Sequence, residues 1–333
     1  MDKAFRRLGR RGPVVMAALA ALLSLAGPAA AQEARAPEGP VEFTIGTRVG
    51  GTPDVLMRKA AQILNEKGIV ENPIVIQNRT GGSWAVSGNY VLSKEGDPNT
   101  IMVVAQPILT TPITQGIPTF YDKITPIGMF IQGGLTLAVQ PDAPYNNLDE
   151  FFEHARNSSS AIRVAGAQAG STDHMVTALV EKAGGVKLNY IPYEGGSEAL
   201  ASFLGGNVEM VVLPPVEALP ELQAGKVKLI ALLSEERRPE PDFADLPTAK
   251  EQGYDIVWGQ SWGLAGPPNL DPAYVKFWDE AITKLLETEE WQAFAAESFL
   301  TSRHTGADKA RAHMDQLHQQ HLELLQELGL AKM

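Results

Sequence analysis

Residues 162–185 read IRVAGAQAGSTDHMVTALVEKAGG and decide the fold. The first five residues are mostly apolar and end on glycine, which is typical of a short buried strand. The second half predicts a helix that Gly184 closes, because its apolar residues recur at helical spacing. These residues are Met175, Val176, Leu179, Val180 and Ala183. The stretch is therefore a strand–turn–helix unit of an α/β protein.

The turn between strand and helix is small and polar. Ser171, Thr172 and Asp173 all suit the N-cap of a helix. The first helical turn has backbone N–H groups without partners and carries the positive end of the helix dipole. Gly170 has no side chain to keep a ligand from these donors. The turn suits an anion, most simply a carboxylate, although a capped helix without any ligand fits the same residues.

A second unit of this kind lies in residues 41–68. A strand at 41–46 leads through a loop at 47–53 into a helix from Asp54, and Pro53 fits the first helical position. Two such units can face each other across a cleft. Strands and helices alternate along the rest of the chain, which predicts parallel α/β sheets with ligands beyond the strand ends.

The predicted domain organisation follows from length and from proline. A chain of 333 residues with 44% hydrophobic and 20% charged residues suggests two globular domains. Prolines break the chain after a strand at 135–139, which suggests that the chain crosses there to a second domain. Residues 255–264 then bring the chain back to the first domain. We expect one domain of residues 41–139 plus 256–333, and an inserted domain of residues 140–255. Residues 107–130 contain four prolines and are expected to be irregular.

The first 31 residues predict a secretory signal peptide. Five basic residues precede an apolar run at 14–26, and Ala29, Ala30 and Ala31 offer a small-residue cleavage site. We therefore expect export to the periplasm. Removal of residues 1–31 takes away those five basic residues and Asp2, so that the net charge moves from −11 to −15. Such a charge argues against binding nucleic acid.

Neither catalytic residues nor a cofactor or metal site is expected. The chain has no cysteine, no P-loop and no dinucleotide fingerprint. Residues 259–263 match G-x-S-x-G around Ser261, but Pro267 and Pro268 follow where a serine hydrolase needs a helix. His313, His318 and His321 share the last helix without a metal-ligand spacing.

From about Phe43 onward the chain resembles the extracytoplasmic receptors of the tripartite tricarboxylate transporter system, also called the Bug family. The resemblance rests on the order and spacing of short motifs. They are Gly50-Gly51 with Asp54 and Arg58, Asn78-Arg79-Thr80-Gly81-Gly82, Gly170-Ser171 with His174, Pro192-Tyr193 with Gly195, Ala199-Leu200, Leu204-Gly205-Gly206, Ala224-Gly225-Lys226, Leu246-Pro247-Thr248 and Gly253-Tyr254.

This resemblance implies a two-domain α/β periplasmic-binding-protein fold of the Venus-flytrap, type II-like kind, with a ligand cleft between the lobes. It implies a small organic carboxylate as ligand, either a di- or tricarboxylate or an aromatic carboxylate. The implied partners are the membrane permease subunits of such a transporter, and we expect a monomer. Two alternatives stay open. The protein is either a receptor that passes its signal to a sensor protein instead of a permease, or a secreted hydrolase.

Carried over position by position, the resemblance indicates a ligand site built from the two glycine loops and their surroundings. Thr52 stands where the family has a third glycine, and Arg48 where it has a small or apolar residue. Arg48 either pairs with a ligand carboxylate or faces solvent or an acidic neighbour. The full set is Arg48, Gly50, Gly51, Thr52, Trp84, Gln106, Gly170, Ser171, Thr172, His174, Tyr193 and Trp262.

Overall fold

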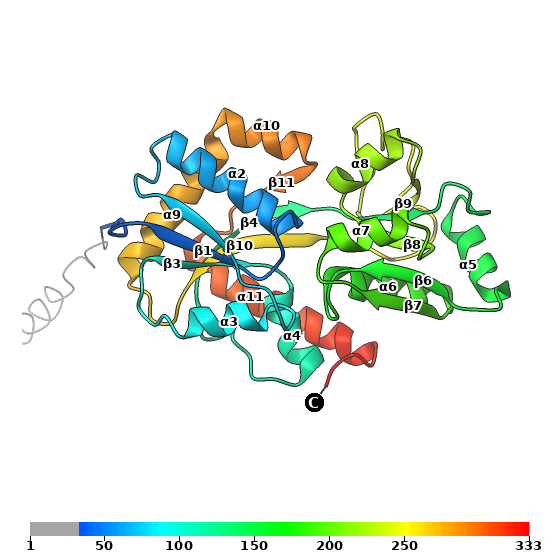
Figure 1. Cartoon of the computed structure of the whole chain (residues 1–333), viewed down its shortest axis with the longest axis horizontal. Coiled ribbons are helices and arrows are strands. Elements are labelled where there is room, and N and C mark those ends of the chain that lie inside the picture. Colours follow the sequence, from blue (N-terminus) through cyan, green and yellow to red (C-terminus); the bar gives the residue numbers. More distant parts are fainter. Residues whose placement is uncertain (1–32, 333) are drawn as a thin grey trace, which may run out of the picture. The chain divides into compact units, whose positions relative to one another are not determined.

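The computed structural model describes residues 33–332 (Figure 1). The expected signal peptide, residues 1–31, lies outside these residues. Among the described residues, no helix combines the length and apolar character that a membrane span requires.

Two sheets organise the described chain. The first has six strands in the order β11-β4-β10-β3-β1-β2. Its strands are β1 (Val41–Ile45), β2 (Ile74–Asn78), β3 (Thr100–Val104), β4 (Thr125–Gly133), β10 (Gln260–Gly266) and β11 (Leu300–Ser302). The second has five strands in the order β7-β6-β8-β5-β9. Its strands are β5 (Thr136–Val139), β6 (Ile162–Gly166), β7 (Leu188–Pro192), β8 (Met210–Leu213) and β9 (Lys228–Leu232).

Helices cover both sheets, as the sequence predicted. We call each sheet with its helices a lobe. The helices of the first lobe are α2 (Thr52–Glu66), α3 (Ala85–Leu92), α4 (Pro107–Gln115), α9 (Pro272–Glu287), α10 (Glu289–Glu297) and α11 (Ala307–Glu327). Those of the second lobe are α5 (Leu148–Asn157), α6 (Thr172–Gly184), α7 (Gly196–Leu204) and α8 (Pro215–Gln223). Ser171 is the N-cap of α6 and accepts from the backbone of His174, and Gly185 ends the helix one residue later than expected.

The prediction of purely parallel sheets was wrong for three strands. β1 pairs in parallel with β2 and β3, but β10 runs antiparallel to both β3 and β4. β5 runs antiparallel to β8 and β9, and β11 to β4. The cause lies in the connection between lobes: β4 carries the chain outward and β10 brings it back beside β4, so the two strands run in opposite directions.

Residues 107–130 are also more regular than their prolines suggested. They hold α4 and the start of β4. Pro107 occupies the first position of α4, where its missing N–H costs nothing. Pro112 lies inside the helix and removes one backbone hydrogen bond. The helix persists because it is buried along most of its length, so tertiary packing outweighs the weak local propensity.

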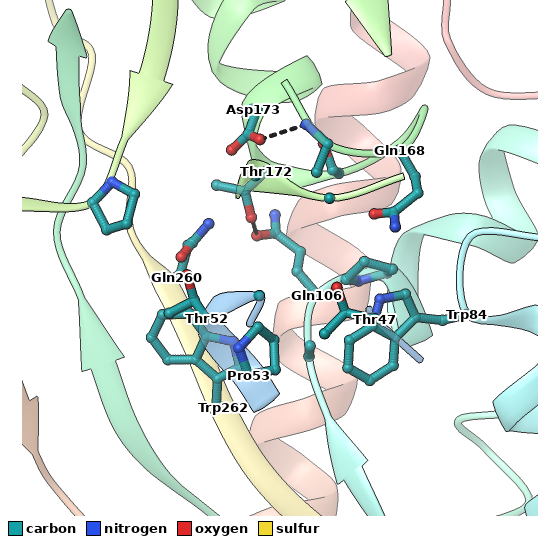
Figure 2. Close-up of a pocket in the computed structure, with 18 of the residues that line it drawn as sticks. Thr47, Thr52, Pro53, Trp84, Gln106, Gln168, Thr172, Asp173, Gln260 and Trp262 are labelled. Carbon is teal, nitrogen blue, oxygen red and sulfur yellow. Dashed lines mark hydrogen bonds between the residues drawn. The ribbon is translucent and has the colours of Figure 1, made fainter. Parts of the chain in front are cut away.

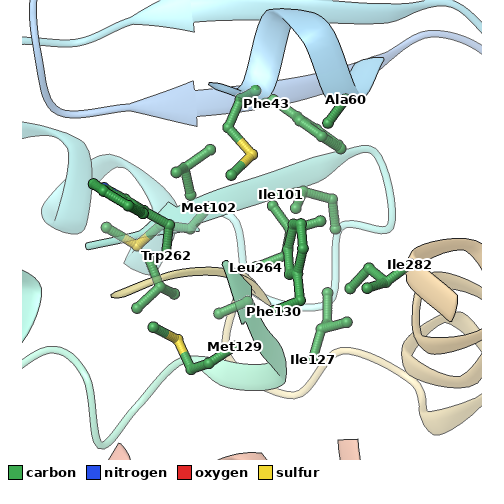
Figure 3. Packing of buried hydrophobic residues seen from close by; sticks show 14 of the residues in the cluster. Phe43, Ala60, Ile101, Met102, Ile127, Met129, Phe130, Trp262, Leu264 and Ile282 are labelled. Atoms are coloured by element: carbon green, nitrogen blue, oxygen red, sulfur yellow. The ribbon is translucent and has the colours of Figure 1, made fainter. Parts of the chain in front are cut away.

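Each lobe has its own hydrophobic core. Figure 3 shows the cluster between the first sheet and its helices, where Phe43, Met102, Phe130 and Leu264 are fully or almost fully buried. Phe43 meets Trp278 of α9 edge to face, with ring centroids 5.4 Å apart. Separate clusters lie around the second sheet. Two independent cores are compatible with lobes that move as rigid bodies.

The domain boundaries remain a proposal. Within residues 33–332, β5 pairs with β8 and β9 and with no strand of the first sheet, so we place the first crossing between lobes at Gly134 and Leu135, ahead of β5. The sequence predicts the return from residue 256, but Ile256 packs in the core of the second sheet and Trp258 N donates to the carbonyl of Leu233, so we place the return after Trp258, ahead of β10.

Gly46 follows β1 and lies against Trp84, whose backbone has a φ of +73°. A Cβ at Gly46 would overlap the indole ring of Trp84. We predict that Gly46→Ala lowers the free energy of unfolding by about 1–3 kcal/mol, the usual cost of overpacking. Denaturant unfolding measures the change. In the control Gly134→Ala, the new Cβ meets nothing nearer than 3.9 Å. Equal stability of the two variants would refute the predicted clash.

Candidate functional site

A pocket lies between the lobes at the carboxyl ends of parallel strands from both sheets. Thr47 follows β1, Gln106 follows β3, Gln168 follows β6 and Pro214 follows β8, and all of them line it. Its volume is about 80 Å³. Gln260, Ser261 and Trp262, at the start of the returning strand β10, complete the wall (Figure 2). The starts of α2, α6 and α7 all reach the pocket.

The structure divides the proposed site residues into two groups. One group lines the pocket: Gly51, Thr52, Trp84, Gln106, Ser171, Thr172 and Trp262. The other group lies outside the lining: Arg48, Gly50, Gly170, His174 and Tyr193. Contact of either group with a ligand stays a prediction.

The first glycine loop uses its backbone donors internally. Gly50 N donates to Asp54 Oδ2 at 2.9 Å, and Gly51 N donates to the carbonyl of Arg48 at 3.2 Å. Asp54 is also held by Arg58 and by Asn78. These bonds fix the turn that precedes α2. Thr52, at the first position of the helix, lines the pocket, and its hydroxyl donates to Glu217 Oε1 at 2.5 Å.

Arg48 and Tyr193 point elsewhere. The guanidinium of Arg48 lies 3.6 Å from a carboxylate oxygen of Glu198 on α7, and about half of each side chain is exposed. This is the pairing with an acidic neighbour that the sequence left open. The hydroxyl of Tyr193 bonds to that of Ser202 at 2.5 Å.

The second glycine loop packs against the first lobe. The carbonyl of Gly170 accepts from Thr110 Oγ1 at 2.6 Å, and a Cβ on Gly170 would lie 2.7 Å from Thr114 Oγ1. Gly170 N donates to Nδ1 of His174 at 3.2 Å. Burial lowers the pKa of His174, which keeps the ring neutral and able to accept this bond. The bare backbone at Gly170 therefore allows contact between the lobes, where the sequence suggested access for a ligand.

Gln106 bridges the lobes at the pocket wall. Its amide nitrogen donates to Nε2 of His321 on α11 at 2.8 Å, and its amide oxygen accepts from the hydroxyl of Thr172 on α6. Burial lowers the pKa of His321 to about 4, so the imidazole is neutral at neutral pH and accepts the amide proton. Both polar atoms of Gln106 are thus engaged in this arrangement.

Several lining residues were absent from the proposed set. Gly195 and Gly196 open α7, which has no side-chain cap, so its first N–H groups are free to meet a ligand. A signal for them existed, because Gly195-Gly196-Ser197 repeats the glycine–serine helix start. Asp173 also lines the pocket and belongs to the polar turn that the sequence predicts as an anion site, although it was not in the proposed set. No local pattern marked Gln168, Glu217 and Gln260 as lining residues.

Among the residues that the structure describes, the lining holds two carboxyl groups and no arginine, lysine or histidine. Asp173 is 6% exposed and accepts from Ala167 N at 2.7 Å. Burial raises its pKa to about 7, against the effect of that hydrogen bond, and the negative charge of Glu217 raises it further. Burial also raises the pKa of Glu217, whereas the bond from Thr52 Oγ1 lowers it.

The elements of an enzyme site do not come together around the serine and histidines noted in the sequence. Ser261 lies inside β10, which continues to Gly266, so it does not sit on a strand–turn–helix elbow. Within residues 33–332, no group of three or more histidine, aspartate or glutamate side chains is placed to hold a metal ion.

Asp173 gives the stability of the protein a specific pH dependence. Between pH 3.8 and about 7 the native carboxyl holds a proton that the unfolded chain has released. The free energy of unfolding therefore falls as pH rises through this window, by up to about 1.4 kcal/mol per pH unit. We predict that Asp173→Asn gains stability relative to the wild type over the same window. Urea unfolding from about pH 4 to 8 measures the difference, with the exposed Asp142→Asn as control. If the difference in unfolding free energy between Asp173→Asn and the wild type does not change with pH, the pH dependence does not come from Asp173.

Comparison with known proteins agrees with this architecture. The chain is 27% identical over 321 residues to the UPF0065 protein in the gbd 5′ region of Cupriavidus necator, covering 96% of each chain. The periplasmic binding protein BugD superposes with a TM-score of 0.82 at 24% identity, over 89% of this chain and all of that one. MatC from Rhodopseudomonas palustris, solved with bound malate, gives a TM-score of 0.76 at 23% identity, over 88% and 99%. These neighbours share the two-lobed fold of periplasmic binding proteins. Residues 56–330 match the model of the tripartite tricarboxylate transporter family receptors, and the chain belongs to that family.

Proposed function

We propose that this receptor binds a small organic carboxylate in the pocket between its lobes and delivers it to the membrane permease of a tripartite tricarboxylate transporter. The observation that carries the proposal is the convergence of α2, α6 and α7, whose starts all reach one pocket. Helix starts attract anions through unpaired N–H groups and the positive end of the dipole. Three of them supply enough donors for a carboxylate without a basic side chain.

Energies support this proposal. Hydrogen bonds to a charged group contribute about 1.5–3 kcal/mol each, and micromolar affinity needs about 8 kcal/mol. Four or five donors in a closed pocket reach that figure after ordering costs. The malate bound by MatC is a small carboxylate of this kind.

Capture and release follow from the bonds between lobes. Thr52 donates to Glu217, Thr172 to Gln106 and Thr110 to the carbonyl of Gly170, and each bond joins one lobe to the other. A ligand enters only when these bonds open. Closure around the ligand then buries it and presents a joined surface of both lobes to the permease.

The substitution Gly195→Asp tests ligand binding without lowering the stability of the protein. Gly195 is the N-cap of α7 and has extended backbone that any residue adopts. Aspartate there caps the helix with its own carboxylate, occupies the donors and adds a negative charge. We predict unchanged or higher stability and a loss of carboxylate affinity of at least about tenfold, or 1.4 kcal/mol.

The experiment uses the protein without residues 1–31. A thermal-shift panel of malate, succinate, adipate, citrate and benzoate finds the ligand, since binding raises apparent stability, and calorimetry measures Kd. Gly195→Ala adds a side chain without a charge or a cap and serves as the matched control. Binding that survives Gly195→Asp would remove the start of α7 from the site, and a panel without any shift would refute the proposed function.

A further inference from the structure

A second hollow lies entirely on the first lobe and shares no lining residue with the pocket between the lobes. Its volume is about 560 Å³. One wall is a face of α11, whose lining residues recur at helical spacing: Lys309, Ala312, His313 and Gln316. The segment between β11 and α11, together with Gln132 of β4, forms the other wall. We call this hollow the α11 groove.

The α11 groove is basic, although the protein is acidic. Its lining includes Arg303, Lys309 and the imidazoles of His304 and His313, and it includes no carboxyl group of the described residues. The linings of three other hollows do include carboxyl groups, namely those of Asp173 and Glu217, Glu181 and Glu327, and Glu194 and Glu198. Because the chain carries 39 acidic against 28 basic side chains, a hollow with basic groups alone runs against the composition.

The two cations of the groove have no partner in the described chain. Arg303 and Lys309 are exposed, and their side chains form no ion pair or hydrogen bond among residues 33–332. Every other arginine of these residues contacts a carboxylate or a backbone carbonyl. A guanidinium presents five N–H donors in a fork that matches a carboxylate. The donors of Arg303 are therefore available to an acceptor from outside the chain.

The imidazoles of the groove are not satisfied within the chain either. Nδ1 of His304 and Nε2 of His313 are buried and have no hydrogen-bond partner in the described residues. Nε2 of His304 bonds to Asp279 Oδ1 at 2.6 Å, and this carboxyl group lies outside the lining. Burial lowers the pKa of His313, and the positive charge of Arg303 lowers it further. Basic groups that feel each other's charge in one hollow create a local field that attracts an anion.

The dimensions of the groove favour an extended peptide as its occupant. Lys309 and Gln316 lie two turns apart on α11, about 10 Å along the helix axis. An extended chain covers this distance with about three residues. A single small anion would leave most of the volume empty, since the pocket between the lobes has a volume of only about 80 Å³. A bilayer surface is flat on this scale and does not enter a hollow.

We propose that the α11 groove docks an acidic segment of a partner protein: a short extended stretch whose aspartate or glutamate side chains pair with Arg303 and Lys309. Every lining residue belongs to the first lobe, so the groove keeps its shape when the lobes open or close as rigid bodies. Docking here therefore does not require a loaded receptor, and the proposal is independent of the carboxylate proposed for the pocket between the lobes.

A labelled hexaglutamate peptide tests the groove. Arg303→Glu and Lys309→Glu are combined in one variant, and fluorescence anisotropy measures Kd at low salt, where screening is weak. The matched control combines Lys123→Glu with Lys284→Glu, because both lysines are exposed, form no ion pair among residues 33–332 and lie outside the groove. Both variants have the same net charge. We expect the groove variant to bind the peptide at least about tenfold more weakly than the control variant.

Three results would overturn the proposal. They are equal binding of the peptide by the two variants, no binding by the wild type, and tighter binding of phosphatidylglycerol vesicles or inorganic phosphate than of the peptide. Thermal unfolding checks that both variants keep the fold, which we expect because Arg303 and Lys309 are exposed and unpaired. Should the charge reversal unfold the protein, glutamine at the same four positions removes the charges without adding acids and makes the same comparison.

Discussion

The antiparallel pairing of β4 with β10 is the constraint on which the rest of the structure depends. β4 leads the chain toward the second lobe, and β10 returns beside it with Trp262 opposite Ile131. The same pairing puts β10 next to β3, so that the residues starting β10 lie close to Gln106 at the end of β3. The wall of the pocket is therefore a consequence of how the chain crosses between lobes.

The remaining lining residues follow from the direction of parallel strands. β1 and β3 in one lobe, and β6 and β8 in the other, all end at the pocket. The helices that follow these strands begin there, so their positive ends converge on the same space. Trp262 belongs both to the core of the first lobe and to the pocket lining, which couples the shape of the pocket to the packing shown in Figure 3.

The sequence predicted those features that depend on local chemistry. Ser171 caps α6 because a serine hydroxyl before an apolar stripe suits that position in almost any context. The bonds of Gly50 to Asp54 and of Gly51 to Arg48 are local, and they were missed because both glycines had been assigned to the ligand. The partner of Gly170 was beyond reach, since Thr110 lies on a helix of the other lobe. Glu217 was missed for a related reason. In the sequence it is one acidic residue in the first turn of a helix, an ordinary stabilising position, and only the fold turns it toward Thr52.

The electrostatics of the pocket follow from where its charges are placed. A chain with many more acidic than basic residues repels anions at long range. The lining contains no basic side chain to reverse this field, so a carboxylate must be attracted by helix starts, whose effect fades beyond the first turn. Such donors act only on a ligand already in place. The pocket therefore selects an anion at short range, through the positions of its backbone donors, while the overall field of the chain opposes the approach of that anion.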